Sequence, residues 1–329
     1  MSQKDTNLRY GLYQGNTRDV ISEIENILVL CKKSVYDLYG NSKDASTRAY
    51  TKRKDSVGDH LRLGHDTHHS SLDMITESLE KSEHNYSLFT RGEFDMKNLN
   101  DYDLVITVGG DGTLFDVARY LDSSIPIMGV NSNPIIGGSV GFTCHCTAGE
   151  FDEVINNLYA QPITIASRLK VNLNGKTLPE NSLNEISFIP SDGFDMFRYR
   201  ATIDGVVLKS LDGNDRLRSG GVLVSSTTGS TAWINEVGGE VMLDDYGLIQ
   251  IRDREIKNAT SRYSSQVVEI ESLSREARFA FDCTASRYDL TLGDRLEISL
   301  GDPLVMFGSF RERREEYQAR KDVENRILK

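Results

Sequence analysis

The chain has 329 residues, of which 38% are hydrophobic and 26% charged, and its formal net charge is −11. Such proportions are typical of a folded globular protein, and the length suits two domains. The acidic balance argues against nucleic acid as a partner, because a phosphate backbone requires basic surface. No stretch approaches the roughly 20 apolar residues that would predict a membrane span.

The first hundred residues change pattern several times. Apolar residues at helical spacing predict a helix over residues 16–28, and a first strand follows over residues 27–31. Residues 40–70 are polar with little periodicity, which predicts a long mobile insertion. An amphipathic helix is predicted over residues 71–82, with a serine at its start as the cap.

The predicted insertion ends in four histidines, His60, His65, His68 and His69. Histidines close together can bind a metal, but no cysteine accompanies them and the segment is polar. We therefore interpret them as surface histidines, with a metal site as the lesser alternative.

The four cysteines are too few and too scattered for a disulfide scaffold: Cys31, Cys144, Cys146 and Cys283. Cys144-His145-Cys146 lacks the ligand number and spacing of a zinc site. In a strand the two cysteines would share one face, and we expect them to be buried as small hydrophobes.

An apolar run, Leu104 to Val108, predicts a buried parallel strand, and it leads directly into Gly109-Gly110-Asp111-Gly112-Thr113. Helical spacing follows, so this stretch is a strand, a glycine turn and a helix. Such a turn suits phosphate, because glycine backbone can approach an anion closely and the helix N-terminus is partly positive. Asp111 would repel phosphate, which indicates a base facing a hydroxyl. The alternative is a carboxylate that caps the helix, and the spacing alone leaves both open.

A further apolar strand is predicted over residues 125–131, ending in Asn131. Asn131 could hydrogen-bond a ribose or close a turn through its own backbone, and we favour the ligand. Strand and helix units up to about residue 130 predict a parallel sheet with crossover helices. One more helix is predicted over residues 150–159.

From Pro162 the apolar residues alternate with period two, and Asn174-Gly175 and Asp204-Gly205 mark hairpin turns. This pattern predicts an antiparallel β domain that extends to about residue 305. Residues 311–329 are dense in charge and predict a solvated or partner-facing helical tail, with Val323, Ile327 and Leu328 as its few apolar residues.

Two stretches of this second region carry polar groups beside strands. Asn184-Glu185 places an amide and a carboxylate at a strand start, either for a hydroxylated ligand or as an ordinary turn. A strand over residues 222–224 opens into a run of small hydroxylic residues that ends at Thr231. Trp233, the only tryptophan, follows; it could stack on a ring or pack in the domain interface.

Three of these motifs together resemble one family. Gly109-Gly110-Asp111-Gly112-Thr113 matches the G-G-D-G-T signature of NAD kinases and diacylglycerol-type lipid kinases. Asn184-Glu185 matches the Asn-Glu/Asp pair of NAD kinases, and Thr228-Gly229-Ser230-Thr231-Ala232-Trp233 resembles their T-G-S-T-A-Y run. The likeness, in order and spacing, covers most of residues 26–305 and identifies the chain as similar to the NAD kinase family.

Departures from the common bacterial pattern point to a branch of that family. Asp116 replaces a basic residue, and Arg218-Ser219-Gly220-Gly221 stands where bacterial enzymes have R-G-D-G. Gly129-Val130-Asn131-Ser132-Asn133-Pro134 resembles the G-V-N-[ST]-D-P form of the mitochondrial and plant types. The chain is thus closer to the mitochondrial and plant NADH-kinase-like branch.

The resemblance implies an enzyme that transfers the γ-phosphoryl group of ATP, with Mg²⁺, to the 2′-hydroxyl of the adenosine ribose of NAD or NADH. Asp111 is then the catalytic base, and Mg²⁺ is held largely by the triphosphate, with no side chain assigned as its ligand. The ligand-binding residues that it implies are Gly110, Gly112, Thr113, Asn131, Asn184, Glu185, Arg218, Gly229, Ser230, Thr231, Ala232 and Trp233.

The predicted organisation is an α/β domain with a parallel sheet over residues 1–148, an antiparallel β domain over residues 149–305 and a helical tail over residues 306–329. A homodimer or homotetramer is implied by the family. A cytoplasmic location is expected because residues 1–15 lack the pattern of a signal or transit peptide. The alternatives are a lipid kinase, which the charge of −11 opposes, and a catalytically silent NAD-binding module, which the presence of Asp111 opposes.

Overall fold

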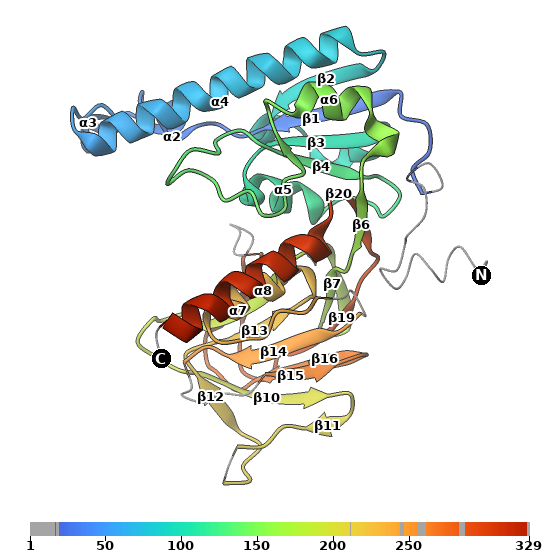
Figure 1. Cartoon of the computed structure of the whole chain (residues 1–329). Helices are drawn as coiled ribbons and strands as arrows, with labels where there is room; N and C mark the ends of the chain where they lie inside the picture. The colour runs from blue at the N-terminus through green and yellow to red at the C-terminus, as the bar shows by residue number, and fades with distance from the viewer. Residues whose placement is uncertain are drawn as a thin grey trace.

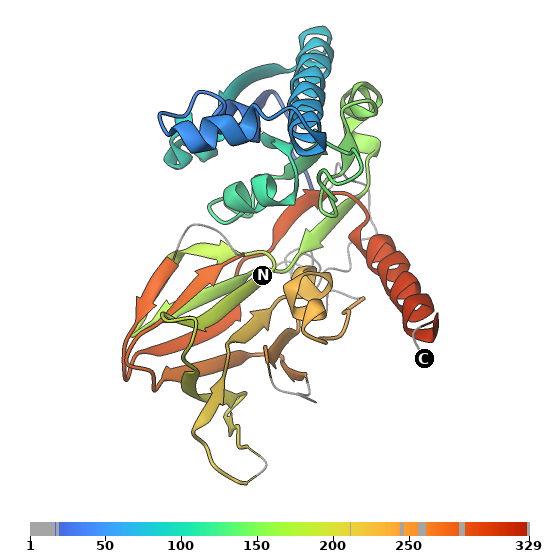
Figure 2. The same ribbon diagram turned by 90° about the vertical axis from the view of Figure 1, so that its left-hand side faces the viewer.

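The computed structural model describes residues 17, 20–210, 212–243, 247–255, 261–282 and 287–327, with side chains to residue 324. Residues 1–15, Cys283 and Leu328, and the side chain of Ile327, lie outside that range. The chain forms two domains, one above the other in Figure 1, and helix α8 runs along one side of the second (Figure 2). None of the described helices is both long and apolar enough to cross a bilayer.

The first domain is a three-layer α/β structure around a mostly parallel sheet in the order β2-β1-β3-β4-β20-β6, with β5 beside β4. Its strands are β1 (Asn26–Cys31), β2 (Asn85–Thr90), β3 (Leu104–Gly109), β4 (Ile127–Asn131), β5 (Cys146–Thr147), β6 (Ile163–Ala166) and β20 (Leu304–Phe307). Its helices are α2 (Val35–Tyr39), α3 (Ala45–Thr51), α4 (Ser56–Lys81), α5 (Asp111–Ala118) and α6 (Phe151–Asn156), with 3-10 turns η2 (Arg91–Glu93), η3 (Met96–Asp101) and η4 (Leu158–Ala160).

Alternation along the buried strands gives each face of this sheet its own core. Ile106 of β3 packs with Ile75 of α4 and Phe151 of α6 on one face. Its neighbour Val105 packs with Leu114 of α5 on the other. Adjacent residues of a strand point to opposite faces, so an uninterrupted apolar strand requires helices on both sides. The parallel sheet expected from the apolar runs is confirmed.

The second domain is a sandwich of two antiparallel sheets, in the orders β11-β10-β16-β19-β7-β8, with β12 beside β10, and β15-β14-β13-β9-β17-β18. Its strands are β7 (Leu169–Leu173), β8 (Lys176–Ser182), β9 (Glu185–Pro190), β10 (Phe197–Ile203), β11 (Val206–Val207), β12 (Leu217–Ser219), β13 (Val222–Ser225), β14 (Ile249–Asp253), β15 (Arg262–Ser264), β16 (Val267–Ser272), β17 (Ala277–Phe281), β18 (Arg287–Leu290) and β19 (Arg295–Leu300). Turn η5 (Thr228–Thr231) and helix α7 (Trp233–Glu236) follow β13, and α8 (Phe310–Ile327) follows β20.

The period-two residues form the core between these sheets, where the rings of Phe188, Phe197 and Phe279 stack at centroid distances of 5.7–5.8 Å. Both expected hairpin turns are present. Asn174-Gly175 and Asp204-Gly205 have positive φ at both positions, as a two-residue hairpin turn requires. The antiparallel β domain is thus confirmed.

The domain boundaries differ from the expected ones. Helix α6, strand β6 and strand β20 all belong to the first domain, and β20 lies between β4 and β6 in its sheet. The period-two signal that starts at Pro162 includes β6, because an edge strand of an α/β sheet alternates in the same way as a sandwich strand. The sandwich therefore spans residues 169–300, and two connections join the domains.

The helix expected over residues 16–28 is wrong in its described part, because residues 20–25 form a turn and irregular chain and β1 begins at Asn26. Ile21 and Ile24 are buried, as the spacing suggested, but side chains replace the helical hydrogen bonds. The Ile24 N–H donates to the Tyr159 hydroxyl at 2.9 Å, and its carbonyl oxygen accepts from the His84 ring at 2.9 Å.

The long mobile insertion expected over residues 40–70 is also wrong. It contains α3 and most of the 26-residue α4, which begins at Ser56 and is capped by Asp55. The helix predicted over residues 71–82 is only its last part. The earlier turns pack through small or polar side chains, Gly58, His68 and Ser71 among them, so they carry no apolar stripe.

Candidate active site

A cleft of about 800 Å³ lies between the domains. The first domain contributes Asp111, Phe115 and residues 140–143, and the second contributes Asn184, Thr228, Thr231, Ala232 and Glu236. One face of α8 supplies the remaining wall, with Arg313, Glu316, Tyr317, Arg320, Lys321 and Glu324. Of the residues expected in the site, the structure brings Asp111, Asn184, Thr231 and Ala232 together here.

Asp111 is the first residue of α5, directly after the glycine turn. Its carboxylate does not cap the helix, since Gly110 is the N-cap residue and no side chain caps this end. Instead Oδ1 accepts hydrogen bonds from the Thr143 N–H at 2.7 Å and the Thr143 hydroxyl at 2.6 Å, and Oδ2 accepts one from the Phe142 N–H at 3.0 Å. These three bonds hold the carboxylate at the wall of the cleft.

The glycine turn is shaped by close packing. A Cβ on Gly109 would lie 2.2 Å from the Thr113 hydroxyl oxygen, and Thr113 is buried beneath the turn. A Cβ on Gly110 would meet the Ser139 hydroxyl oxygen at 2.0 Å, whereas Gly112 has open space around it. Gly112 is therefore the glycine at which a ligand can approach the backbone.

Asn131 ends β4, but its side chain is engaged in the loop that follows. Its Oδ1 accepts from the Asn133 N–H at 3.1 Å, and its Nδ2 donates to the Ser139 carbonyl at 3.1 Å. The residue is buried and does not line the cleft. The structure thus shows the turn-closing arrangement, and the ligand role that we favoured stays a prediction.

Asn184 is positioned by a residue that the sequence reasoning did not assign, Asp282. The Asp282 carboxylate is buried and accepts from the Ser182 hydroxyl at 2.6 Å and from the N–H groups of Leu183, Asn184 and Glu185 at 3.0, 2.6 and 3.2 Å. Burial raises the pKa of Asp282, while these donors act in the opposite direction.

Glu185 follows Asn184 in the first position of β9, opposite Ser225 of β13, and is 2% exposed. It does not line the cleft. Successive residues of an extended chain point to opposite sides, so an Asn184 that faces the cleft directs Glu185 away from it.

The hydroxylic run forms the end of β13 and turn η5, and it is largely buried. Gly229 is required there, because a Cβ would lie 2.2 Å from the Asn184 carbonyl oxygen. Ser230 is buried behind the wall and accepts from the Met242 N–H at 3.0 Å. Thr228 and Thr231 line the cleft, and the buried Thr228 hydroxyl has no partner among the described groups.

Arg218 and Trp233 lie outside the cleft wall. Arg218 is exposed on β12 and lines a separate hollow beside Arg198 and Arg216. Trp233 is partly buried at the start of α7, and the Arg254 guanidinium lies 4.6 Å from the centre of its ring. Among the described residues it is not part of the three apolar core clusters, and the choice between stacking on a ring and packing in the domain interface stays open.

The expectation that residues 311–329 are a tail apart from the site is wrong. Helix α8 is anchored by buried Phe310 and Arg314, and the Arg313 guanidinium donates to the carbonyl of Phe142 at 2.7 Å, to that of Cys144 at short range and to that of His145 at 3.1 Å. Through these hydrogen bonds Arg313 fixes the loop whose N–H groups bind the Asp111 carboxylate. The cleft residues recur at helical spacing from 313 to 324, so the face is formed by charged side chains rather than an apolar stripe.

All the positively charged side chains that line the cleft come from one wall. They are Arg313, Arg320 and Lys321 of α8, and acidic side chains of the same helix lie beside them. Lys321 lies 3.3 Å from Glu236 and 5.4 Å from the Tyr317 ring. No three His, Cys, Asp or Glu side chains converge here within the described part of the chain.

Elsewhere in the first domain, Cys144 and Cys146 are buried, as expected. Burial raises the pKa of the Cys146 thiol to about 12, and it raises that of Cys144 still further. Asp116, the departure from bacterial sequences, forms short ion pairs with Arg91 and Arg119. It therefore lies among fixed cations, outside the cleft.

A carboxylate on a glycine turn, set opposite polar groups of a β sandwich, defines a two-domain kinase that phosphorylates a hydroxyl group. Comparisons with known proteins agree. The family profile described as ATP-NAD kinase N-terminal domain matches residues 45–163. A rice protein (Oryza sativa subsp. japonica) named probable NADH kinase is 31% identical over 239 residues, which cover 64% of this chain and 72% of that protein. The chain belongs to the NAD kinase family and is a phosphotransferase.

Solved structures show the same fold. The yeast NADH kinase complexed with NADH matches with a TM-score of 0.64 and 16% identity over 88% of this chain and 84% of that one. The NAD kinase of Archaeoglobus fulgidus in complex with ATP matches with a TM-score of 0.61 and 20% identity over 88% and 96%. The predicted family, its plant NADH-kinase-like branch and the two-domain α/β and β fold are thus confirmed.

Proposed function

We propose that the interdomain cleft binds NAD or NADH together with ATP, and that Asp111 accepts the proton of the adenosine 2′-hydroxyl as the γ-phosphoryl group is transferred to it. One observation carries this assignment. An ionised carboxylate has about four acceptor positions, and the loop occupies three of them. The position left on Oδ2 is available to a substrate hydroxyl at the wall of the cleft.

Groups on the opposite wall support the binding of a nucleoside. The Asn184 side chain lines the cleft while its backbone is fixed by Asp282 and by the Ser226 N–H, which donates to its carbonyl at 2.9 Å. Thr228 and Thr231 line the same space beside Asn184. Hydroxyl and amide groups are the donors and acceptors that a ribose or base of NAD(H) requires.

Backbone N–H groups and cationic side chains near Asp111 would bind the phosphates of ATP. Gly112 lies open at the N-terminal turn of α5, where backbone N–H groups favour anions. Arg320 and Lys321 face the cleft from α8. Mg²⁺ bound to the triphosphate would neutralise the charge that develops on the transferred group. The chain's own contribution is then to orient the hydroxyl, take its proton and position the phosphates.

A coupled assay tests the proposal. The full chain is incubated with ATP and Mg²⁺ and either NAD or NADH. An NADP-specific dehydrogenase reports the NADP formed from NAD, and an NADPH-specific reductase reports the NADPH formed from NADH; parallel reactions replace ATP with polyphosphate. Formation of the 2′-phosphorylated product is expected in at least one ATP reaction. Diacylglycerol or a sphingoid base as the only phosphate acceptor would favour a lipid kinase. Binding of NAD(H) without turnover would favour the silent module.

The assembly and compartment are proposed from the family resemblance and the sequence. A homodimer or homotetramer is expected by light scattering, and a monomer at working concentrations would contradict it. A cytoplasmic location is expected for the tagged full-length protein, and co-fractionation with an organelle would contradict that.

A further inference from the structure

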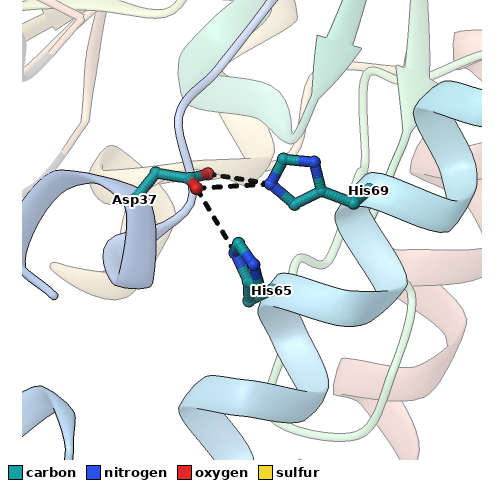
Figure 3. Close-up of side chains that lie close together, drawn as sticks. All are labelled: Asp37, His65 and His69. Atoms are coloured by element: carbon teal, nitrogen blue, oxygen red, sulfur yellow. Dashed lines mark hydrogen bonds and ion pairs between the residues drawn. The ribbon is translucent and has the colours of Figure 1, made fainter.

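A second group of convergent polar side chains lies on the first domain, apart from the cleft. It consists of Asp37, His65 and His69 (Figure 3). One nitrogen of each histidine and one carboxylate oxygen lie within 4.8 Å of one another. In the part of the chain that the structure describes, no other set of three such side chains comes together in this way.

Two helices build this cluster. His65 and His69 are four residues apart on α4, so both rings project from one face of that helix. Asp37 comes from α2, the short helix that follows β1. Figure 3 shows both rings directed from α4 toward the carboxylate. Metal-binding histidines of helices have this same spacing, because two turns of one face can share one ion.

Asp37 is fixed by an outer contact. The N–H and the hydroxyl of Ser34 both donate to Asp37 Oδ2, at 3.0 and 2.8 Å, and the Asp37 N–H donates back to the Ser34 hydroxyl at 3.0 Å. This capping box leaves Oδ1 directed toward the histidines. A ligand carboxylate held by an outer hydrogen bond is the usual arrangement in a metal site.

The separations match those of a coordination sphere. His69 Nε2 lies 3.3 Å from Asp37 Oδ1 and 3.1 Å from Oδ2, and His65 Nδ1 lies 3.5 Å from Oδ1. Ligand atoms around a tetrahedral zinc ion, at 2.0–2.1 Å from the metal, are about 3.4 Å apart. Only small shifts of the side chains would place all three atoms around one ion.

We propose that Asp37, His65 and His69 form a binding site for a divalent transition metal of the Zn²⁺ type. The side chains of Asp37, His65 and His69 are 28%, 26% and 48% exposed, so a fourth position is open to water. Two imidazoles and one carboxylate suit Zn²⁺ and Co²⁺, whereas Mg²⁺ and Ca²⁺ require oxygen ligands. The site is therefore separate from the Mg²⁺ that accompanies the triphosphate.

Binding requires a change of protonation. The Ser34 hydroxyl donates to Asp37, so the Ser34–His65 contact at 2.8 Å needs a proton on His65 Nδ1. A metal ion on Nδ1 must displace that proton: an imidazolium releases it to solvent, and a neutral ring exchanges it for a proton on Nε2, so metal-bound His65 carries its single proton on Nε2. The ion would join α2 to α4. His68, which directly precedes His69 on α4, contacts Ser132 at 2.7 Å and the Lys32 carbonyl at 2.9 Å, so the cluster lies beside the ends of β1 and β4.

The test is metal binding by the full chain after treatment with a chelator. Equilibrium dialysis against ZnCl₂ gives stoichiometry and affinity, and the visible spectrum of added CoCl₂ reports coordination by protein ligands. The ligand variants are His69→Gln and Asp37→Asn. The matched control is His60→Gln, because His60 also lies on α4, is not part of the cluster and has its ring nitrogen 3.3 Å from the Gly137 carbonyl.

We expect one Zn²⁺ per chain, an affinity at least ~10-fold weaker in each ligand variant and an unchanged affinity in His60→Gln. Zn²⁺ should also raise the melting temperature of the parent chain and of His60→Gln, but not that of His69→Gln. Equal affinity in the parent and both ligand variants would overturn the proposal, and so would an equal loss in His60→Gln. If one ligand variant fails to fold, the near-isosteric Asp37→Asn or His65→Gln provides the same comparison.

Discussion

Replacement of Asp111 by asparagine removes the proposed base while it keeps the size of the side chain. Loss of a positioned general base lowers turnover by ~10²–10⁴-fold. We expect kcat to fall at least ~10²-fold, which corresponds to about 2.7 kcal/mol in the activation barrier. The KM for NAD(H) should change little, because the proton is accepted mainly in the transition state.

The structure adds a second effect that has to be separated from the first. Asparagine has one acceptor oxygen and one NH₂ group, but the loop presents donors to both carboxylate oxygens of Asp111. One donor, at Phe142 or Thr143, would face the NH₂ group and lose its partner, at a cost of about 1–3 kcal/mol to the loop. Part of any loss of activity could therefore come from a displaced loop.

Thr143→Val is the matched control. It removes the hydroxyl donor to Asp111 but keeps the carboxylate and both backbone donors. We expect a cost of about 1 kcal/mol in loop stability and a turnover within ~10-fold of the parent. Both variants are measured in the coupled assay at saturating ATP and NAD(H). Turnover of Asp111→Asn within tenfold of the parent, or an equal loss in Thr143→Val, would refute the base assignment.

Three further predictions concern Trp233, Arg313 and His68. Trp233→Ala should raise the KM for NAD(H) with kcat unchanged, and NAD(H) should alter the fluorescence of this single tryptophan; a flat titration at saturating NAD(H) would remove it from the site. Because its main described ring contact is the Arg254 guanidinium, the same variant should lose only about 1 kcal/mol of stability. Arg313→Ala should lower kcat by up to ~10²-fold, because the loop that holds Asp111 is released; a kcat equal to the parent's would contradict this. Burial lowers the pKa of His68 from 6.5 to about 4, so as the pH falls from 7 to 5 the unfolded chain takes up the proton first. This residue alone should lower the free energy of unfolding by about 2 kcal/mol between pH 7 and pH 5. Urea titrations at the two pH values should therefore show a smaller decrease for His68→Asn than for the parent, and an equal decrease in both proteins would contradict the prediction.

Three strands of the first domain and the antiparallel character of the second could be predicted, because the period of the apolar residues reports how they are buried. Continuous apolar runs predicted β1, β3 and β4, and alternation predicted the antiparallel sandwich, whereas β2 and β20 were not predicted. Gly-containing turns with positive φ located the hairpins. These patterns can be interpreted locally, since apolar and polar residues alternate along a half-buried strand, whereas a fully buried strand is apolar throughout.

Helix α4 shows why other elements were missed. The part of it before Leu72 packs through Gly58, His68 and Ser71, and small or polar residues give no apolar stripe even when they are buried. His68 was interpreted as a surface residue for the same reason. It is 1% exposed, because Ser132 and the carbonyl of Lys32 satisfy both ring nitrogens. Partners far away in the sequence made that burial possible, and no local pattern reports them.

A residue of the candidate site could be predicted where its role follows from the motif in which it stands. Asp111, Asn184 and Thr231 come from local motifs, and they meet at one cleft. Arg313 and Asp282 act on segments 171 and 98 residues away, through the Phe142 carbonyl and the Asn184 N–H. Their roles depend on tertiary contacts. The shared helical face of the cleft residues on α8 was visible in the sequence, but a charged face is also what a solvated helix presents.

The position of β20 has a consequence for the order in which the protein folds during synthesis. Strand β6 pairs only with β20 in the described sheet, and β20 begins at Leu304, after the last strand of the sandwich. The first sheet therefore stays incomplete until the whole sandwich has been synthesised. Strands β7 to β19 form a contiguous stretch and need no later segment to close their sandwich. Domains usually fold in the order of their synthesis, N-terminal first; here the second domain can mature while the first still waits for its last strand.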